Sequence, residues 1–203
     1  MSREKNIKWY NGCVNRTNRE YLNGHKSVVL WFTGLSGAGK STLAYSVEEA
    51  LHKKGFRTFV LDGDNIRHGL SSDLGFSVHD QSENLRRIGE VTKLFFDSGS
   101  IVLVSVISPF LKDRERVRKL INSDKFFEIY VNCPIHVCEQ RDTKGLYKLA
   151  QSGEIKNLIG LHSPYEEPTK PELTINTNQI TMNKSVNKVM AFLKDKKIIN
   201  GTI

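Results

Sequence analysis

Residues 28–42 read VVLWFTGLSGAGKST and decide the fold of the chain. The run 28–32 is continuously apolar and rich in β-favouring residues, which predicts a strand buried on both faces. A glycine-rich turn follows it, and apolar residues then recur at helical spacing over 41–54. Gly55 stands where a glycine that ends a helix is expected. A buried strand, a glycine turn and a helix in this order are the setting in which phosphate-binding loops occur.

The turn from Gly34 to Ser41 matches the phosphate-binding pattern G-x-x-x-x-G-K-S/T. Its glycines let backbone N–H groups approach phosphate oxygens, and the helix that opens at Lys40 adds its positive dipole end. We expect Lys40 to reach the β- and γ-phosphates and Ser41 to give its hydroxyl to Mg²⁺. The motif predicts binding of a nucleoside triphosphate but does not define the reaction. The residues predicted to bind it are Gly34, Leu35, Ser36, Gly37, Ala38, Gly39, Lys40, Ser41 and Thr42.

Apolar runs alternate with amphipathic stretches along the rest of the chain. Strands are predicted at 57–62, 100–107, 126–131 and 173–176, and helices from Ser82 to Gly99 and at 113–122, 134–141 and 185–194. With the strand at 28–32, this order indicates an α/β fold with a five-stranded parallel sheet and helices on both faces. Segment 143–171 is rich in Lys, Gly, Pro and Glu and too long for an ordinary connection, so we expect a lid. Residues 1–26 lack a strong pattern, which predicts an N-terminal appendage on one domain at 27–203.

The composition gives a formal net charge of +8, from 30 basic and 22 acidic residues in 203. A surplus of this size predicts an acidic partner, which could be nucleic acid, a membrane surface or phosphorylated small molecules. We expect no nucleic acid, because no stripe of interleaved basic and aromatic residues is visible, and no membrane span, because the apolar runs are far shorter than about 20 residues. The polar first residues lack a signal-peptide pattern, so the expected location is the cytoplasm.

The acidic residues favour a small-molecule kinase over other classes that use this loop. A switch GTPase would carry Asn-Lys-x-Asp late in the chain, and a motor ATPase would place a carboxylate after the strand 100–107; neither is present. Asp62, Asp64 and Arg67 instead follow the strand 57–62, at the sheet edge where open α/β sheets bind ligands. A phosphate loop, a carboxylate–arginine cluster and a lid suit a P-loop NTPase fold that transfers phosphate between bound molecules. A capped turn with a local ion pair is the alternative interpretation of this cluster.

Several blocks in order resemble the adenylylsulfate kinase family. They are WFTGLSGAGKST (31–42), LDGDNIRHGL (61–70), DLGFS (73–77), ENLRRIGEVTKLF (83–95), ISPF (107–110), RD (141–142), KGLY (144–147) and PYEEP (164–168). The likeness spans about residues 7–178. It implies transfer of the ATP γ-phosphate to the 3′-hydroxyl of adenosine 5′-phosphosulfate (adenylylsulfate), with Mg²⁺ as cofactor. Family members are often homodimers, so the resemblance also implies that state.

The resemblance assigns roles to individual positions. Asp64 would be the group nearest the attacking 3′-hydroxyl, as general base or orienting acceptor, and Asp62 with Ser41 would hold the hydrated Mg²⁺. Phe76 matches an aromatic residue that stacks on the adenine of adenylylsulfate, and Arg141 lies on the ATP side. The implied catalytic residues are Asp64, Lys40 and Ser108. The implied substrate-binding residues are Asp64, Asn65, Arg67, Phe76, Gln81, Asn84, Ile107, Ser108, Phe110, Lys144 and Leu158.

Four individual positions lead to further predictions. Some family members are assigned a phosphoserine intermediate at the position of Ser108; the sequence provides no base beside it, and we therefore expect direct in-line transfer. Gln81 stands where the family commonly has an arginine, which predicts weaker adenylylsulfate binding or, as the alternative function, another nucleotide-linked anion as acceptor. Thr143 replaces a usual proline and is expected to loosen the lid. Leu158 replaces an aromatic residue and would give a weaker version of its substrate contact.

Overall fold

The computed structural model describes residues 7–121 and 123–199. Its elements are α1 (Arg16–Asn23), β1 (Val28–Thr33), α2 (Lys40–His52), β2 (Thr58–Asp62), α3 (Gly63–Arg67), α4 (Val78–Asp97), β3 (Ile101–Ser105), α5 (Leu111–Ile121), η2 (Ser123–Lys125), β4 (Phe126–Asn132), α6 (Ile135–Arg141), α7 (Leu146–Gln151), β5 (Leu173–Asn176) and α8 (Met182–Asp195). No helix in these ranges is both long and apolar enough to cross a bilayer.

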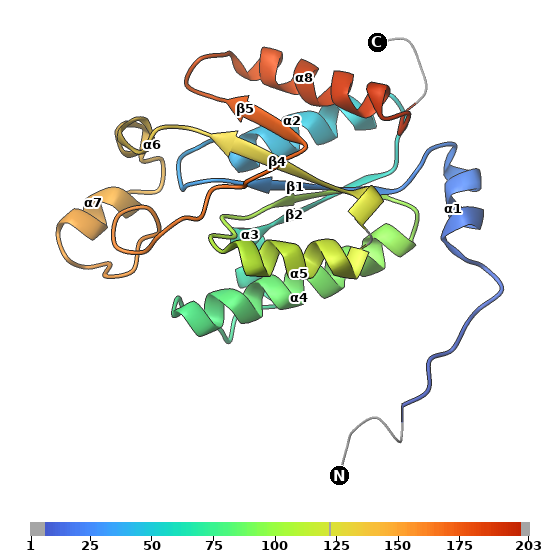
Figure 1. The fold of residues 1–203 in the computed structure, drawn as a ribbon, viewed down its shortest axis with the longest axis horizontal. Helices are drawn as coiled ribbons and strands as arrows, with labels where there is room; N and C mark the ends of the chain where they lie inside the picture. Colours follow the sequence, from blue (N-terminus) through green and yellow to red (C-terminus); the bar gives the residue numbers. More distant parts are fainter. Residues whose placement is uncertain (1–6, 122, 200–203) are drawn as a thin grey trace.

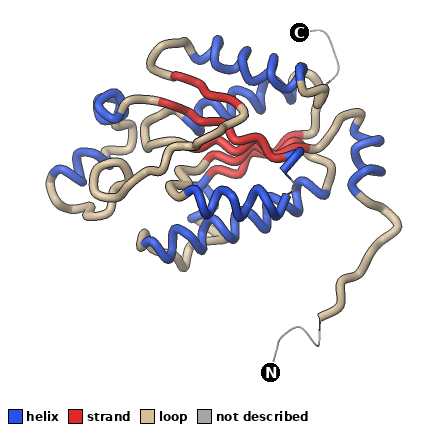
Figure 2. The backbone as a smooth tube through the Cα atoms, in the orientation of Figure 1, coloured by secondary structure: helices blue, strands red, loops and turns tan. Residues whose placement is uncertain are grey.

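The five strands form one parallel sheet in the order β2-β3-β1-β4-β5. Helices α2 and α8 cover one face and α4 and α5 the other (Figure 1). The strands lie together in the centre, enclosed by helices (Figure 2). The predicted α/β P-loop fold with a five-stranded parallel sheet is therefore confirmed.

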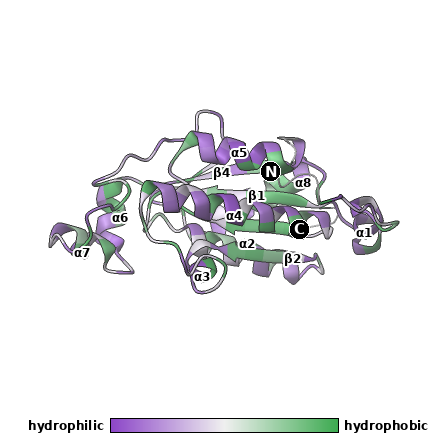
Figure 3. Cartoon of the chain, turned by 90° about the horizontal axis from the view of Figure 1, so that it is seen from below, coloured by the Kyte–Doolittle hydropathy of each residue, from purple (hydrophilic) through white to green (hydrophobic). Residues whose placement is uncertain are grey.

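The central strand β1 explains why the sheet is buried on both sides. Every residue from Val28 to Phe32 is completely buried. Val28, Leu30 and Phe32 pack into the core under α2 and α8, whereas Val29 and Trp31 pack into the core under α4 and α5. Figure 3 shows the apolar colour on the strands and the polar colour on the outer helix surfaces. A continuous apolar run is what a strand with two covered faces requires.

Several predicted boundaries differ from the structure: α5 begins at Leu111 and α8 at Met182, two and three residues before their predicted starts. The helix expected from Ser82 begins one turn earlier, at Val78, because the Ser77 side chain caps it by accepting a hydrogen bond from the Asp80 amide at 3.1 Å. The strand expected over 100–107 ends at Ser105, and residues 106–110 form an irregular segment. Asn122, the predicted end of the charged helix, lies outside the described residues.

The predicted appendage contains a short helix, α1, that contacts the rest of the molecule. Asn23 donates to the Gly99 carbonyl at 2.9 Å, and Arg19 donates to the Asp97 carbonyl at 2.9 Å. Glu20 is buried and accepts hydrogen bonds from the amide and the hydroxyl of Ser27. These contacts join α1 to the end of α4 and the start of β1. Residues 1–6 of the predicted appendage lie outside the described residues, and the boundary at residue 27 remains a prediction.

Candidate active site

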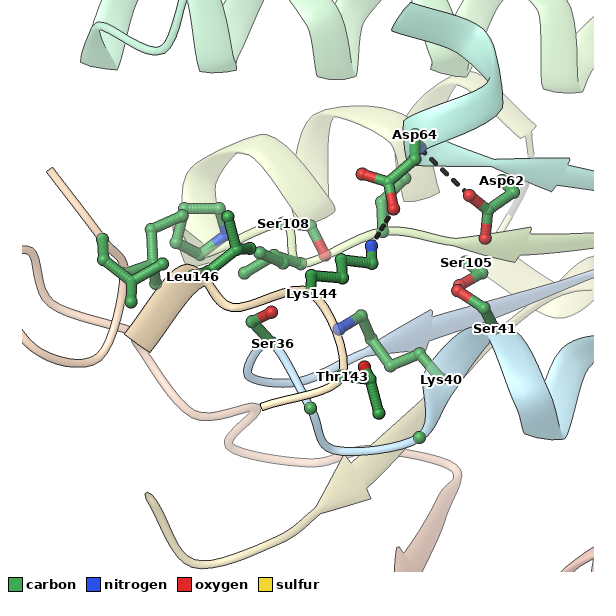
Figure 4. Close-up of a pocket in the computed structure, with 18 of the residues that line it drawn as sticks. Ser36, Lys40, Ser41, Asp62, Asp64, Ser105, Ser108, Thr143, Lys144 and Leu146 are labelled. Atoms are coloured by element: carbon green, nitrogen blue, oxygen red, sulfur yellow. Dashed lines mark hydrogen bonds and ion pairs between the residues drawn. The ribbon is translucent and has the colours of Figure 1, made fainter. Parts of the chain in front are cut away.

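A cavity of about 900 Å³ lies at the carboxyl edge of the sheet, between the glycine loop, α3, the start of α4 and the segment after α6. Most of the predicted site residues line it. They are Ser36, Gly37, Gly39, Lys40, Ser41, Thr42, Asp62, Asp64, Arg67, Phe76, Gln81, Asn84, Ile107, Ser108, Arg141, Lys144 and Leu158. Figure 4 shows the centre of this group, where residues from four separate parts of the sequence face one another.

Five predicted residues do not line the cavity. Gly34 and Ala38 are buried within the loop and Leu35 is partly buried, and none of the three lines the cavity. Asn65 donates from its side chain to the hydroxyl of Tyr45 at 3.0 Å, away from the cavity. Phe110 lies under the ammonium group of Lys112, which is 5.6 Å from its ring centroid.

The glycine loop is packed too tightly for side chains at two positions. Gly34 has a φ of 151°, and a Cβ there would lie 2.4 Å from the Val131 carbonyl oxygen. Gly37 has a φ of 75°, and a Cβ would lie 2.8 Å from the Cys138 carbonyl oxygen. The loop is also tied from outside, because Tyr147 donates to the Ser36 carbonyl at 2.9 Å. Glycine at these two positions therefore lets the loop pack closely against β4 and α6, and it also leaves the loop amides accessible.

Lys40 is a buried cation at the start of α2. The residue is only 8% exposed, and its Nζ donates to the Leu35 carbonyl at 2.8 Å. Burial, with a smaller contribution from the nearby Lys144 cation, lowers the pKa of Lys40 to about 8. An anionic ligand beside Lys40 would favour its charged form and raise its pKa again.

Asp62 and Ser41 offer oxygen atoms that fit a hydrated Mg²⁺ ion. One carboxylate oxygen of Asp62 accepts from the Asp64 amide at 3.0 Å, while the other is buried and has no hydrogen-bond partner. The Ser41 hydroxyl lies 3.1 Å from that of Ser105. No cluster of three or more His, Cys, Asp or Glu residues that could hold a metal occurs in 7–121 and 123–199. The fit is therefore to an ion held largely by water and phosphate oxygens, as Mg²⁺ commonly is.

Asp64 forms an ion pair with Lys144 across the cavity (Figure 4). Asp64 lies in the first turn of α3, and Lys144 comes from the loop between α6 and α7. Their side chains are 60% and 50% exposed, so solvent screens the pair and its net stabilisation is small. The pair can open without a large cost when substrates enter.

Arg67 and Gln81 hold the short loop that carries Phe76. Arg67 donates to the carbonyls of Leu74 and Gly75 at 3.4 and 3.0 Å, and its guanidinium lies 4.4 Å from the Phe76 ring centroid. Gln81 donates its amide to the Phe76 carbonyl at 2.9 Å. Three successive carbonyls are thereby fixed, which orients an exposed aromatic ring at the mouth of the cavity.

Asn84 has an unused hydrogen-bonding atom in the cavity wall. The residue is 7% exposed, and its carbonyl oxygen is buried without a partner. Buried polar atoms are nearly always paired in native proteins. This oxygen is therefore a candidate contact for a ligand donor.

Sequence reasoning missed several residues of the site. Trp31 lies in the run predicted to be a buried strand, and its Nε1 donates to the Ser108 hydroxyl at 3.0 Å, a contact that the apolar pattern does not predict. Thr177 directly follows β5 and accepts a hydrogen bond from Arg141 at 3.2 Å while donating to the Ala38 carbonyl at 2.8 Å. Lys156 and Met182 also line the cavity. The rule that ligands bind at the carboxyl ends of parallel strands was sufficient to select Thr177.

This arrangement defines the class: a P-loop kinase-type protein, in which a phosphate loop, a carboxylate pair and the segment after α6 line one cavity. The sequence model of the adenylylsulphate kinase family matches residues 26–176. The chain is 56% identical to an adenylyl-sulfate kinase of Geotalea daltonii, covering 97% of each chain, and 54% identical to a probable adenylyl-sulfate kinase of Bacillus subtilis, covering 98% of this chain and all of the relative. The structure of the Mycobacterium tuberculosis APS kinase CysC in complex with AMPPNP and APS superposes with a TM-score of 0.80 at 44% identity, over 84% of this chain and 99% of that one. The chain belongs to the adenylylsulfate kinase family.

Proposed function

We propose that this protein transfers the γ-phosphate of ATP to the 3′-hydroxyl of adenylylsulfate, giving 3′-phosphoadenylylsulfate and ADP. The observation that carries the proposal is that a single cavity is lined by the phosphate loop with Lys40, by Asp64 and by Asn84, whose carbonyl oxygen is buried without a partner. Such a cavity has room for two nucleotides in contact. Relatives more than 50% identical over nearly the whole chain carry the adenylyl-sulfate kinase name.

The test is ADP release measured with a panel of acceptors. Adenylylsulfate is expected to support the highest kcat/KM, and 3′-phosphoadenylylsulfate should be recovered as product. AMP and other nucleotide-linked anions serve as the alternative acceptors that the Gln81 substitution suggested. Gln81 is hydrogen-bonded to the Phe76 carbonyl, so its position gives no reason to prefer another acceptor. A higher kcat/KM for any other acceptor would contradict the proposal.

In the proposed reaction, the protein aligns two anions and neutralises their charge. Lys40 and the amides of the loop would hold the β- and γ-phosphates, while Arg141 and Thr177 support the loop by donating hydrogen bonds to its carbonyls. Mg²⁺, held through Asp62 and Ser41, would supply charge neutralisation on the phosphates. Asp64 would accept a hydrogen bond, and then the proton, from the 3′-hydroxyl. Phe76 would support the adenine ring of adenylylsulfate.

Ser108→Ala is expected to retain more than about 1% of the wild-type kcat, which follows from direct in-line transfer. The Ser108 hydroxyl accepts from Trp31 at 3.0 Å and donates to the Thr33 hydroxyl at 2.9 Å, and neither partner is a base that could activate it. Some loss of thermal stability is expected, because the buried Trp31 N–H loses its acceptor. Steady-state kinetics and a melting curve provide the measurement. Phosphoserine trapped in the wild type, with a lower kcat in the variant than stated, would support a covalent intermediate instead.

A homodimer is supported by exposed apolar side chains near the amino-terminal end of the described chain. Ile7, Trp9, Tyr10, Tyr21 and Leu22 are between 77% and 91% exposed. Large apolar side chains gathered in one segment are typical of a surface that a partner covers. Light scattering is expected to give twice the mass of one chain, and a monomer at micromolar concentration would contradict the proposal.

The cytoplasmic location remains a prediction from the sequence.

A further inference from the structure

The loop after β3 turns through a strained residue at the cavity wall. Ser108 has a φ of 44°, in the left-handed region that residues other than glycine rarely adopt, and it is 2% exposed. Ile107, Ser108 and Pro109 all line the cavity. A conformation of this kind persists only when the surrounding structure holds it.

A buried guanidinium group lies directly behind this turn. Arg114, on α5, is 3% exposed and donates to the Ser108 carbonyl at 2.6 Å through Nη1. Its Nη2 donates to the Glu166 carbonyl at 2.7 Å. Its Nε lies 2.6 Å from a carboxylate oxygen of Glu128, on β4, with which it forms an ion pair. One side chain thus joins α5, the turn at Ser108, the sheet and the segment at Glu166.

Further contacts fix the same turn to the segment around residue 165. The Ser108 hydroxyl donates to Thr33, whose hydroxyl also lies 2.9 Å from that of Tyr165. The Glu166 amide donates to the Pro109 carbonyl at 2.8 Å. Arg114 lies beneath the Tyr165 ring, with its guanidinium carbon 5.7 Å from the ring centroid. Arg114 therefore occupies the centre of the contacts that hold the turn.

We propose that Arg114 is a positioning residue that holds Ile107 and Ser108 in the geometry needed to bind the acceptor nucleotide. This inference rests on the proposed kinase function, and it assigns a role to a residue that does not line the cavity. A planar guanidinium can donate to two carbonyls at fixed angles while its charge pairs with a carboxylate, whereas a lysine ammonium is a single flexible point charge. The acceptor side should depend on this contact more than the ATP side, since the phosphate loop is held by Tyr147, Arg141 and Thr177 instead.

The test is Arg114→Lys in the full chain, which keeps the charge and removes the fork. We expect the KM for adenylylsulfate to rise about tenfold, with the KM for ATP and the affinity for ADP changed less than about twofold. Arg116→Lys is the matched control: this residue lies on the same helix, and its side chain is 43% exposed. Its constants should equal those of the wild type. An unchanged KM for adenylylsulfate in Arg114→Lys, or an equal rise for both substrates, would overturn the proposal.

The strained backbone at Ser108 allows a second experiment, whose result should not change if Arg114 contributes only to overall stability. Glycine adopts a positive φ without the steric cost that alanine meets. Arg114→Lys should therefore raise the KM for adenylylsulfate less in a Ser108→Gly background than in a Ser108→Ala background. Equal effects in the two backgrounds would count against the positioning role. If Arg114→Lys does not fold, Glu128→Gln, which weakens the ion pair, should raise the same KM by a smaller factor, and no rise would overturn the proposal.

Failure of the proposed function is distinguishable from failure of this inference. If the wild-type chain does not turn over adenylylsulfate, the proposed function is wrong, whatever the variants do. Amide hydrogen exchange over residues 107–111 then still tests the contact, because it should be faster in Arg114→Lys than in wild type and Arg116→Lys. Unchanged exchange would overturn the positioning role.

Discussion

Lys40→Met is expected to lower kcat/KM for ATP by about a thousandfold, as the loss of a positioned charge in a preorganised site typically does. Methionine keeps the length of the side chain but cannot neutralise the phosphates. Lys40 is the buried cation of the phosphate loop, only 8% exposed and hydrogen-bonded to the Leu35 carbonyl. Steady-state kinetics with adenylylsulfate at saturation gives the measurement.

The lower kcat/KM of Lys40→Met should result from the missing charge in the site and not from unfolding of the variant. Burial lowers the pKa of Lys40 to about 8, so below that pH the folded state holds a desolvated cation at a cost in stability. The melting temperature of nucleotide-free Lys40→Met should therefore be no lower than that of the wild type at pH 7. Lys53→Met, at the end of the same helix in an exposed ion pair with Glu49, is the matched control and should keep full activity. A melting temperature well below the wild-type value would assign the loss to misfolding.

The same lysine should give ATP binding a pH dependence. The pKa of Lys40 is below its ordinary value, so the free protein loses this proton as pH rises through about 8, and its folding stability gains from that loss up to the pKa of the unfolded chain. Bound phosphate favours the protonated form, so ATP affinity should fall above about pH 8, with proton uptake on binding. The guanidinium that Lys40→Arg introduces stays protonated in this range, so this variant should show no such uptake in calorimetry.

The centre of the sheet was predictable because β1 and β3 are continuously apolar and buried, and short apolar runs between turns are typical of strands with two covered faces. The edge at which ligands bind followed from the same parallel order, which was enough to predict Lys40, Asp62 and Asp64 at one site. The missed turn of α4 did carry a signal, since Ser77 followed three residues later by Asp80 is an N-cap pattern.

Other features depended on contacts between distant parts of the chain. The bond between Trp31 and Ser108 joins residues 77 positions apart, and no local pattern encodes it. Gln81 was expected to contact an anion, but its amide is hydrogen-bonded to the Phe76 carbonyl five residues back, on a loop whose shape depends on Arg67. α7 is only six residues long and begins after a glycine, so its pattern is too short to separate from a loop. Motifs therefore predicted which residues meet, whereas the partners that orient them required the structure.

Asp64→Asn is expected to lower kcat by about 10²–10⁴-fold, the contribution typical of a positioned general base. Asparagine keeps the shape and one acceptor oxygen but can neither carry the charge nor take the proton of the 3′-hydroxyl. The KM for ATP should change little, because Lys40 and the loop remain intact. Glu49→Gln removes a carboxylate charge from an exposed pair on α2 and is the matched control, with full activity expected.

The ion pair with Lys144 offers a competing explanation, in which Asp64 only holds the Lys144 side chain in place. A double-mutant cycle separates the two. If Asp64 acts on the acceptor hydroxyl, Asp64→Asn should lower kcat as much in a Lys144→Met background as in the wild type. If Asp64 acts only through the ion pair, Asp64→Asn should not lower kcat further in the Lys144→Met background, because Lys144→Met has already removed the pair. We expect the first result, since the pair is half exposed and screened, whereas proton transfer needs a carboxylate at that place in every turnover.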